Sequence, residues 1–323
     1  MPLYHIKHIT RYHYPSQVTD SANQIILKPQ DSKHQEIKDI SISLKPGAPV
    51  DYFADYLGNQ VGVFTIVEPH DTLEITSELE VETFPIPEPQ PTVLPQEEWN
   101  ALKELAYNFE YLDFIKPEVF EAKDEILAIV KGLATEGVSV FETVKKLSAY
   151  IYENFTYKQG VTNVETGIDE IWQLKAGVCQ DFAHLLSEML RLLGIPSRYI
   201  SGYICPVNHE LRGEGATHAW VEAYLPDYGW FGIDPTNNCN VSDRHVKIAY
   251  GRNFNDCTPV KGTYKGPGSH TLTVLVTISN EKNTAEAKPA EPVYVAEAPK
   301  PVADTAMNSY QRFLEMQQQQ QQQ

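Results

Sequence analysis

Five prolines between residues 85 and 95 divide the chain into two parts with different patterns of apolar residues. Proline has no backbone N–H to donate and its φ angle is fixed, so this stretch can extend neither a sheet nor a helix. Apolar residues alternate with polar ones before it and recur every three or four residues after it. The 323 residues are enough for about two domains. We therefore predict a β-rich N-terminal domain over 1–84, an extended linker over 85–96 and a mixed core over 97–280.

The first part has the period of β-strands. Leucine, isoleucine and valine largely alternate with acidic residues and threonine between Leu73 and Val81, as expected for a strand with one buried face. The same alternation occurs between Ile40 and Leu44, and the turn sequence Lys45-Pro46-Gly47 ends it. Several short strands without intervening helices predict a small antiparallel β-sandwich.

The second part begins with helices. Apolar residues at helical spacing predict helices over 97–111, 118–133 and 139–155. A fourth helix should begin near Cys179, and Gly194 followed by Pro196 provides its stop. Strands are predicted after it, over 198–204, 217–225, 229–233 and 270–278. Helices followed by strands predict an α+β core in which the helices pack on an antiparallel sheet.

The last segment, residues 281–323, is rich in alanine, glutamate, lysine and proline and ends in seven glutamines. Such a composition buries too little apolar surface to offset the entropy lost on ordering. We predict that this tail is disordered, apart from a short turn that Tyr310, Phe313 and Leu314 could form.

Charge and cysteine content exclude several classes of protein. The net charge of −17 argues against a nucleic-acid partner and against docking on an anionic membrane surface. The start of the chain has no long apolar run, so we expect neither a signal peptide nor a membrane span. Four cysteines without a CxxC pair predict neither a disulfide scaffold nor a zinc ribbon, and a reducing cytoplasmic location fits best. We expect no metal and no cofactor, since no calcium loop occurs and His5, His8 and His13 lie in a strand whose faces alternate.

Cys179 lies at the predicted start of the fourth helix, directly after Gly177-Val178. A helix N-terminus has unpaired N–H groups and a partial positive charge, and both favour a thiolate over a thiol. The alternative is a small buried cysteine at the helix start. Position alone does not decide between them.

Two later segments favour a reactive thiol. His218 lies near the start of one predicted strand, and Asp234 ends the next strand after a tight turn over 226–229. Adjacent antiparallel strands can hold these two side chains together. A cysteine nucleophile, a histidine base and a carboxylate that orients the base form a catalytic triad.

Other residues near these segments have two readings. Gln173 could donate to an oxyanion, or it could lie on the surface that leads to the helix. Trp220 could stack on a substrate or fill the core. The loop over 206–216 separates two strands and could contact a substrate, whereas His184 is expected to make a local hydrogen bond.

Three motifs resemble the bacterial transglutaminase-like cysteine enzymes of the papain-like superfamily. They are GVCQDFAHLLSEMLRLLGIPSRYISGY (177–203), THAWVEAYLPDYGWFGIDPTNN (217–238) and HVKIAYGRNFNDCTPVKGTYKG (245–266). Residues 1–84 resemble the β-rich N-terminal region of many bacterial members. Within the third motif, Asn253 and Cys257 replace a more usual aspartate and aliphatic residue, and neither change affects the triad.

The resemblance implies a transglutaminase-like, papain-like core. Because no calcium loop occurs in the sequence, the calcium dependence of animal transglutaminases is not expected here. It implies that Cys179 is the nucleophile, His218 the general acid and base, and Asp234 the residue that orients His218. The expected activity is cleavage or transfer at amide C–N bonds of a peptide, protein or amide substrate through an acyl-enzyme, with hydrolysis favoured over transamidation. The alternatives are a catalytically silent binding module and a thioester-dependent acyltransferase. The sequence does not indicate the oligomeric state.

Overall fold

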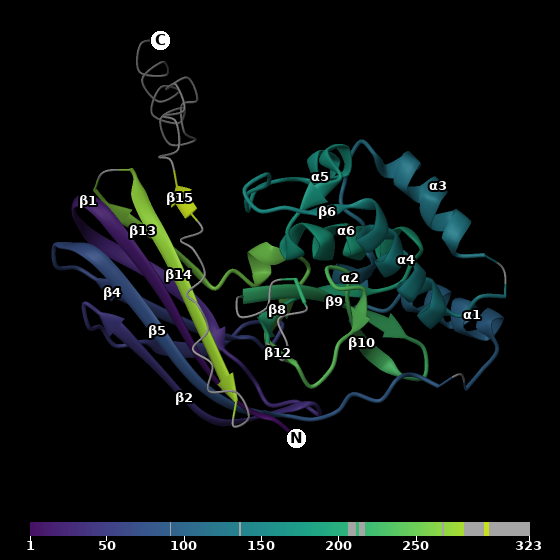
Figure 1. Ribbon diagram of the computed structural model, residues 1–323, viewed down its shortest axis with the longest axis horizontal. Coiled ribbons are helices and arrows are strands. Elements are labelled where there is room, and N and C mark those ends of the chain that lie inside the picture. The colour runs from purple at the N-terminus through teal and green to yellow at the C-terminus, as the bar shows by residue number, and fades with distance from the viewer. Residues whose placement is uncertain are drawn as a thin grey trace, which may run out of the picture.

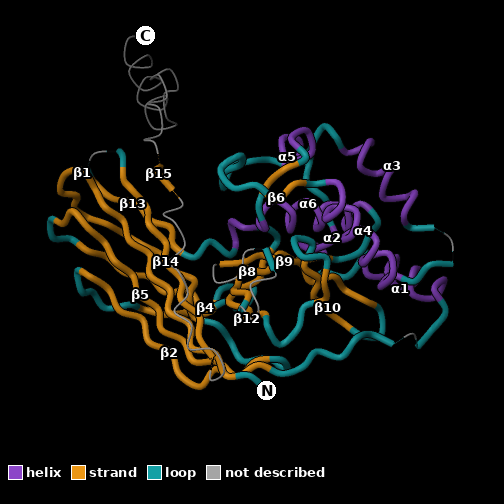
Figure 2. Tube along the Cα trace, viewed as in Figure 1, coloured by secondary structure: helices purple, strands orange, loops and turns teal. Residues whose placement is uncertain are grey.

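The computed structural model describes residues 1–90, 92–135, 137–205, 211–212, 217–266 and 268–280, and the backbone of 294–296. Strands gather on one side of the molecule and helices on the other, with a second, smaller sheet between them (Figures 1 and 2). This mixed arrangement confirms the predicted α+β class. None of the described helices is long and apolar enough to span a lipid bilayer.

The N-terminal strands form one curled antiparallel sheet around the long strand β1 (Leu3–Lys28). The first part of β1 lies between β5 (His70–Thr83) and β14 (His270–Asn280), and its last part pairs with β4 (Gln60–Ile66) and β13 (Val260–Lys265). The remaining strands are β2 (Gln35–Lys45), β3 (Asp51–Ala54) and β15 (Tyr294–Ala296). The two parts of β1 face a common apolar core made by Tyr14, Val18, Ile25, Leu27, Phe64, Ile66, Leu73 and Ile75.

The sheet of the N-terminal region takes two long strands from the other end of the chain. Strand β14 pairs with β1 from Tyr4–Asn280 to His13–Thr271, and β13 pairs with it from Thr19–Lys265 to Ile25–Val260. Residues 260–280 were assigned to the core by sequence, because their apolar pattern indicates a strand but not its partner. A boundary at the proline-rich segment therefore does not separate the two sheets.

The second sheet has the strand order β11-β10-β9-β8-β12. These strands are β8 (Ser197–Ile204), β9 (Thr217–Leu225), β10 (Gly229–Asp234), β11 (Cys239–Asn240) and β12 (His245–Gly251). The predicted turn joins β9 to β10, where Asp227 and Gly229 have positive φ angles that the tight reversal requires.

Helices cover this second sheet (Figure 1). They are α1 (Pro95–Leu105), α2 (Leu112–Ile115), α3 (Lys123–Leu133), α4 (Val140–Asn154), α5 (Ile168–Leu174) and α6 (Cys179–Leu192). Helix α6 packs against β9, and its apolar residues from Phe182 to Leu190 are completely buried. It begins and ends where the sequence predicts, with Gly194 in the left-handed conformation after its last turn.

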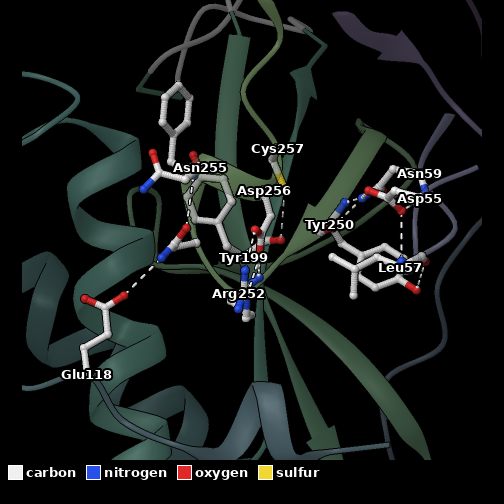
Figure 3. A network of polar contacts seen from close by, with 12 residues as sticks. Asp55, Leu57, Asn59, Glu118, Tyr199, Tyr250, Arg252, Asn255, Asp256 and Cys257 are labelled. Atoms are coloured by element: carbon white, nitrogen blue, oxygen red, sulfur yellow. Dashed lines mark hydrogen bonds and ion pairs between the residues drawn. The ribbon is translucent and has the colours of Figure 1, made fainter. Parts of the chain in front are cut away.

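Side chains join the N-terminal sheet to strand β12 of the second sheet. Gln35 bonds with the backbone of Lys247 in both directions, and Asn59 does the same with Tyr250. Figure 3 shows the second contact, in which the Tyr250 hydroxyl also donates to the carbonyl of Leu57. Buried backbone groups of one region are thus satisfied by the other, which fixes the two regions relative to each other.

Several predictions concern residues that the structure describes little or not at all. Of the loop 206–216 only Leu211 and Arg212 are described, so its predicted contact with a substrate lies outside the described residues. The predicted disorder of 281–323, and the turn at 310–314, also lie outside them. Within that tail the backbone of Tyr294–Ala296 forms β15 on the edge strand β14.

Candidate active site

Cys179 is the first residue of helix α6, and its side chain is partly exposed. The buried carboxylate of Asp181 holds this helix start, because its Oδ2 accepts the backbone N–H of Val178 at 2.7 Å and the hydroxyl of Thr162 at 2.6 Å. Gly177 permits this contact: a Cβ at that position would lie 2.5 Å from the Asp181 Oδ2. The chain before α6 is therefore fixed, and it fixes the direction in which Cys179 points.

A second contact supports the same turn. The short strand β6 (Thr156–Tyr157) runs parallel to β7 (Ala176–Gly177), and Tyr157 lies opposite Gly177. Burial, and next the nearby Cys179, raise the pKa of Tyr157 to about 12. Its phenol therefore remains protonated at neutral pH and can donate a hydrogen bond close to the thiol.

His218 and Asp234 lie on neighbouring antiparallel strands and are hydrogen-bonded. His218 is on β9, opposite Gly202 of β8, and Asp234 ends β10 on the other side. The His218 Nε2 lies 2.8 Å from the Asp234 Oδ2, and both residues are almost completely buried. The sequence predicted this juxtaposition from the tight turn between the two strands.

Asp234 receives further donors from the chain that follows it. Its Oδ1 accepts the backbone N–H of Thr236 at 2.9 Å, and its Oδ2 accepts the side-chain amide of Asn237 at 2.7 Å. Burial would raise the pKa of Asp234, but the charge and hydrogen bond of His218, followed by the nearby His245, hold that pKa well below its usual range. The carboxylate is therefore ionised in this buried site.

The bond to Asp234 occupies Nε2 of His218 and leaves Nδ1 available. The Nδ1 atom is buried and has no hydrogen-bond partner among the described residues. Burial alone would lower the pKa of His218, but Asp234, and to a lesser extent Cys179, raise it to about 10. An imidazolium beside Cys179 stabilises a thiolate, and it can also supply a proton to a leaving group.

The other three cysteines have different surroundings. Burial raises the pKa of the Cys205 and Cys257 thiols well above the usual value and that of Cys239 to about 12. All four cysteines are free. Cys179 is thus the cysteine that combines a helix N-terminus with a histidine–carboxylate pair.

Residue His245 was not identified as part of the site from the sequence. Its Nδ1 accepts the N–H of Ser242, and its Nε2 lies 3.6 Å from the Asp234 Oδ2. Burial lowers its pKa, so the ring is neutral and presents its N–H toward the carboxylate. The sequence feature that could have identified His245 is its position at the start of the third motif, only eleven residues after Asp234.

The atoms of His218, Asp234 and His245 also fit the donor set of a metal, since they lie within 4.8 Å of one another. The shared Asp234 Oδ2 is already engaged by His218 and Asn237. A cation at this point would replace those hydrogen bonds, so the described contacts favour a hydrogen-bonded triad.

Of two other residues singled out by sequence, one is exposed and one lies in the core. Gln173 is exposed on α5, and no described hydrogen bond joins it to Cys179 or His218. Trp220 is only 1% exposed, with its ring packed edge-on to His245 at 5.2 Å and beside His218. It therefore supports the two histidines from the core. The absence of a Cβ at Gly202 makes room for its ring, which would lie 2.6 Å from that atom.

His184 has the local role expected from the sequence. Its Nε2 accepts the backbone N–H of Phe254 at 3.0 Å, and burial, followed by the charge of Arg191, lowers its pKa to about 4. A neutral ring is the form that can accept this bond.

Known families match the two regions of the chain. Residues 128–235 match the transglutaminase-like superfamily, and residues 4–82 match the bacterial transglutaminase-like N-terminal region. An uncharacterized protein of Mycobacterium leprae is 31% identical over 278 residues, which cover 85% of this chain and 97% of that protein. An uncharacterized protein of Mycobacterium tuberculosis is 34% identical over 276 residues, covering 80% and 86% of the two chains.

Two further similarities concern a solved structure and a shorter sequence match. A Cytophaga hutchinsonii structure described as a candidate cysteine protease has the same fold, with a TM-score of 0.70, 22% identity, and coverage of 91% of this chain and 94% of that one. A Pseudomonas aeruginosa protein named protein-glutamine gamma-glutamyltransferase is 33% identical over 97 residues, which cover 28% of this chain and 14% of that protein. Both regions match family models, and the match to the Mycobacterium leprae protein extends over most of both chains. The chain therefore belongs to the transglutaminase-like superfamily, in the form that carries the bacterial transglutaminase-like N-terminal region.

Proposed function

We propose that the protein is a cysteine enzyme that cleaves amide C–N bonds through an acyl-enzyme, with Cys179, His218 and Asp234 as its triad. The observation that carries the proposal is the direction of the His218 ring. Its Nε2 is bonded to the buried Asp234, which leaves Nδ1 for the thiol, and Cys179 is near enough to help raise the pKa of the ring. This is the arrangement required to hold a thiolate and then to move a proton.

In the proposed reaction the Cys179 thiolate adds to the carbonyl carbon of the amide. The oxyanion that forms accepts a hydrogen bond from the backbone N–H of Cys179. His218 then donates its proton to the amide nitrogen, the C–N bond breaks, and the amine or ammonia leaves a thioester on Cys179. Water attacks the thioester while His218 takes its proton, so that a carboxylic acid leaves and the thiolate is restored.

A second hydrogen-bond donor to the oxyanion would raise the rate by a factor of about 10²–10³. We propose the Tyr157 hydroxyl for this role. It is supported by the pairing of β6 with β7 beside Cys179 and by the raised pKa that keeps the phenol protonated. Gln173 was the donor considered from the sequence, and its exposed position on α5 favours Tyr157 instead.

Water is the acceptor that we favour, since a transamidating site has to exclude water and Cys179 is partly exposed. Transfer to an amine is the second candidate. One observation supports it, namely the similarity over 97 residues to a protein named protein-glutamine gamma-glutamyltransferase. The substrate in either case would be a peptide, a protein or a smaller amide.

The proposal is tested by the reactivity of the four cysteines. The native protein is treated with limiting iodoacetamide at about pH 6, and the modified peptides are quantified by mass spectrometry after digestion. We expect Cys179 to react at least about tenfold faster than the other three, because burial raises their thiol pKa. Loss of the fast alkylation phase in the Cys179→Ala variant would assign that phase to Cys179. Equal reactivity of all four thiols would refute an activated Cys179.

The two alternatives predict different products. A panel of peptides, screened by intact mass for an acyl-enzyme and by release of ammonia or amine, separates an enzyme from a silent binding module. Turnover of an acetyl thioester without turnover of any amide would indicate a thioester-dependent acyltransferase. We expect an acyl-enzyme from an amide, and its loss in Cys179→Ala.

We propose a cytoplasmic site of action. The four unpaired cysteines support it, because thiols persist most readily in a reducing compartment. Fractionation of the source cells, with an antibody to the protein, is expected to place it with a cytoplasmic marker. Recovery with the envelope or secreted fraction would refute this location.

A further inference from the structure

A cavity of about 370 Å³ lies between the N-terminal sheet and the first turn of α6 with the start of β9. Gln180 and Thr217, which are adjacent in sequence to Cys179 and His218, line one side of it. Strands β1 and β14 of the N-terminal sheet line the other. The size is at the lower end of the range of about 300–1,000 Å³ that is typical of ligand pockets. This cavity thus suits one bulky group rather than a long polymer.

The wall on the side of the N-terminal sheet is one face of a regular ladder. Thr10 pairs with Val274 and Tyr12 with Leu272, and all four side chains line the cavity. Successive residues of a strand point to opposite faces, so residues two apart share this wall. Phe254, in the segment that connects β12 to β13, and Val260, the first residue of β13, extend the apolar surface.

The described lining of the cavity is uncharged. Among the residues that the structure describes, no aspartate, glutamate, lysine or arginine lines it. Burial lowers the pKa of His8 to about 4 and also lowers that of His270, so both histidines are neutral at physiological pH. A charged group placed here would lose its hydration without gaining a partner, whereas an apolar group would be stabilised.

Hydrogen bonds hold the two walls in position. The His8 Nδ1 lies 2.8 Å from the hydroxyl of Tyr203, which belongs to strand β8 next to His218. On the opposite side, Asn253 donates to Glu118, and Arg252 is paired with Asp256 (Figure 3). Phe254 lies between these anchored residues. The cavity is therefore built before any ligand arrives.

We propose that this cavity binds an uncharged aromatic or branched aliphatic group attached next to the amide bond that Cys179 attacks. The substrate class would be amides and peptides with such a residue at the scissile bond, selected by Tyr12, Leu272 and Val274. This inference rests on the proposed function, because it assigns the cavity to the substrate of Cys179.

The test uses alkylating amides that differ only in the attached group. Each transfers its carboxamidomethyl carbon to the Cys179 sulfur and releases iodide, so no natural substrate is needed. Rates for iodoacetamide, N-benzyl-iodoacetamide and the anionic N-carboxymethyl-iodoacetamide are each divided by the rate with glutathione. We expect the benzyl reagent to react with Cys179 at least about tenfold faster than iodoacetamide and to show saturation. The anionic reagent should be slower than iodoacetamide.

The variants Leu272→Asp and Val274→Asp place a carboxylate in the cavity. Thr271→Asp, on the exposed face of the same strand, is the matched control. We expect either cavity variant to lose the preference for the benzyl reagent while its rate with iodoacetamide, which reports an intact Cys179, stays within about twofold of the wild type. Thr271→Asp should retain the preference.

The outcomes separate the two proposals. If Cys179 reacts no faster with iodoacetamide than the other cysteines do, the proposed function fails. If Cys179 is fast but shows no preference for the benzyl group, or if the preference survives in both cavity variants, only the present inference fails. A preference for the anionic reagent would also overturn it.

Discussion

At the scale of single residues, the carboxylate of Asp234 is the group on which the hydrogen bonds of the candidate site converge. It is fully buried and accepts hydrogen bonds from His218, Thr236 and Asn237, with the N–H of His245 directed at it from 3.6 Å. A buried charge is tolerated only when it is paired and hydrogen-bonded. Removing the charge while keeping the shape therefore tests what the carboxylate does for His218.

Replacement of Asp234 by asparagine should remove the interaction that raises the pKa of His218 to about 10. The imidazolium is then less stable, and so is the thiolate beside it. We expect the rate of Cys179 alkylation at about pH 6 to fall at least about tenfold, and amide turnover to fall by about 10²–10⁴. Both are measured on the purified variant, alongside its circular dichroism spectrum.

The control for this change is Asp227→Asn, the same substitution in the exposed turn between β9 and β10. Asp227 has a φ angle of 64°, which asparagine also adopts readily. This variant should alkylate like the wild type. Unchanged reactivity of Asp234→Asn, in a folded protein, would show that the carboxylate does not tune His218.

Residues of the site differed in how far sequence could predict them. Cys179, His218 and Asp234 were identifiable because a helix start, a tight turn and a strand end are local signals. The positions of Tyr157 beside Gly177 and of His245 beside Asp234 were not predicted, because they depend on a two-residue parallel pairing and on a chain reversal after Asp234, neither of which has a periodic pattern. Trp220 had two readings, and only the packing around Gly202 shows that its ring is in the core.

The start of helix α6 is the element that positions the thiol. Asp181 accepts the N–H of Val178 and the hydroxyl of Thr162, and it is 1% exposed. Asp181→Ala should therefore leave the Val178 N–H unsatisfied and loosen the first turn. We expect the free energy of unfolding to fall by about 1–2 kcal/mol and Cys179 alkylation to slow. Denaturant titration and the iodoacetamide assay measure the two effects.

Two comparison variants make this result specific. Asp124→Ala makes the same change in the exposed first turn of α3 and should have a much smaller effect. Thr162→Val removes only one of the two bonds to Asp181 and should be intermediate. Equal effects of Asp181→Ala and Asp124→Ala would mean that the buried carboxylate does not hold the helix start.

Elements with a strong period were predicted well, and short ones were not. The alternation at 73–81 and the apolar stripe of 179–193 correspond to β5 and α6, because burial of one face imposes the period. Helix α5 spans only seven residues and β6 and β7 two each, too short for a period to appear. The predicted helix over 97–111 ends earlier, at Leu105, and a separate short helix α2 follows.

At the scale of the molecule, the two regions share one hydrophobic core. Tyr4, Ile6 and Val81 of the N-terminal sheet belong to the same buried cluster as the helices of the second region. The C-terminal strands β13 and β14 complete the N-terminal sheet. Sequence could not show this, because a strand pattern contains no information about a partner more than 230 residues away. The N-terminal sheet and the second region are thus parts of one folded unit.

The buried His8, which joins the N-terminal sheet to strand β8, should make the stability of the fold sensitive to acid. It is 2% exposed, is bonded to Tyr203 of β8, and has a pKa that burial lowers from 6.5 to about 4. Since the folded state binds the proton less tightly than the unfolded state, the contribution of His8 to stability is complete above about pH 6.5 and is lost as the pH falls toward 4.

Between pH 7 and 5 we expect the wild type to lose about 1–2 kcal/mol more unfolding free energy than His8→Gln, in which no group titrates at this position. His5→Gln, an exposed histidine on the opposite face of β1, should lose as much as the wild type. Parallel pH profiles for the wild type and His8→Gln, measured by denaturant unfolding, would mean that the pKa of His8 is the same in the folded and unfolded states, and that His8 does not make the fold sensitive to acid.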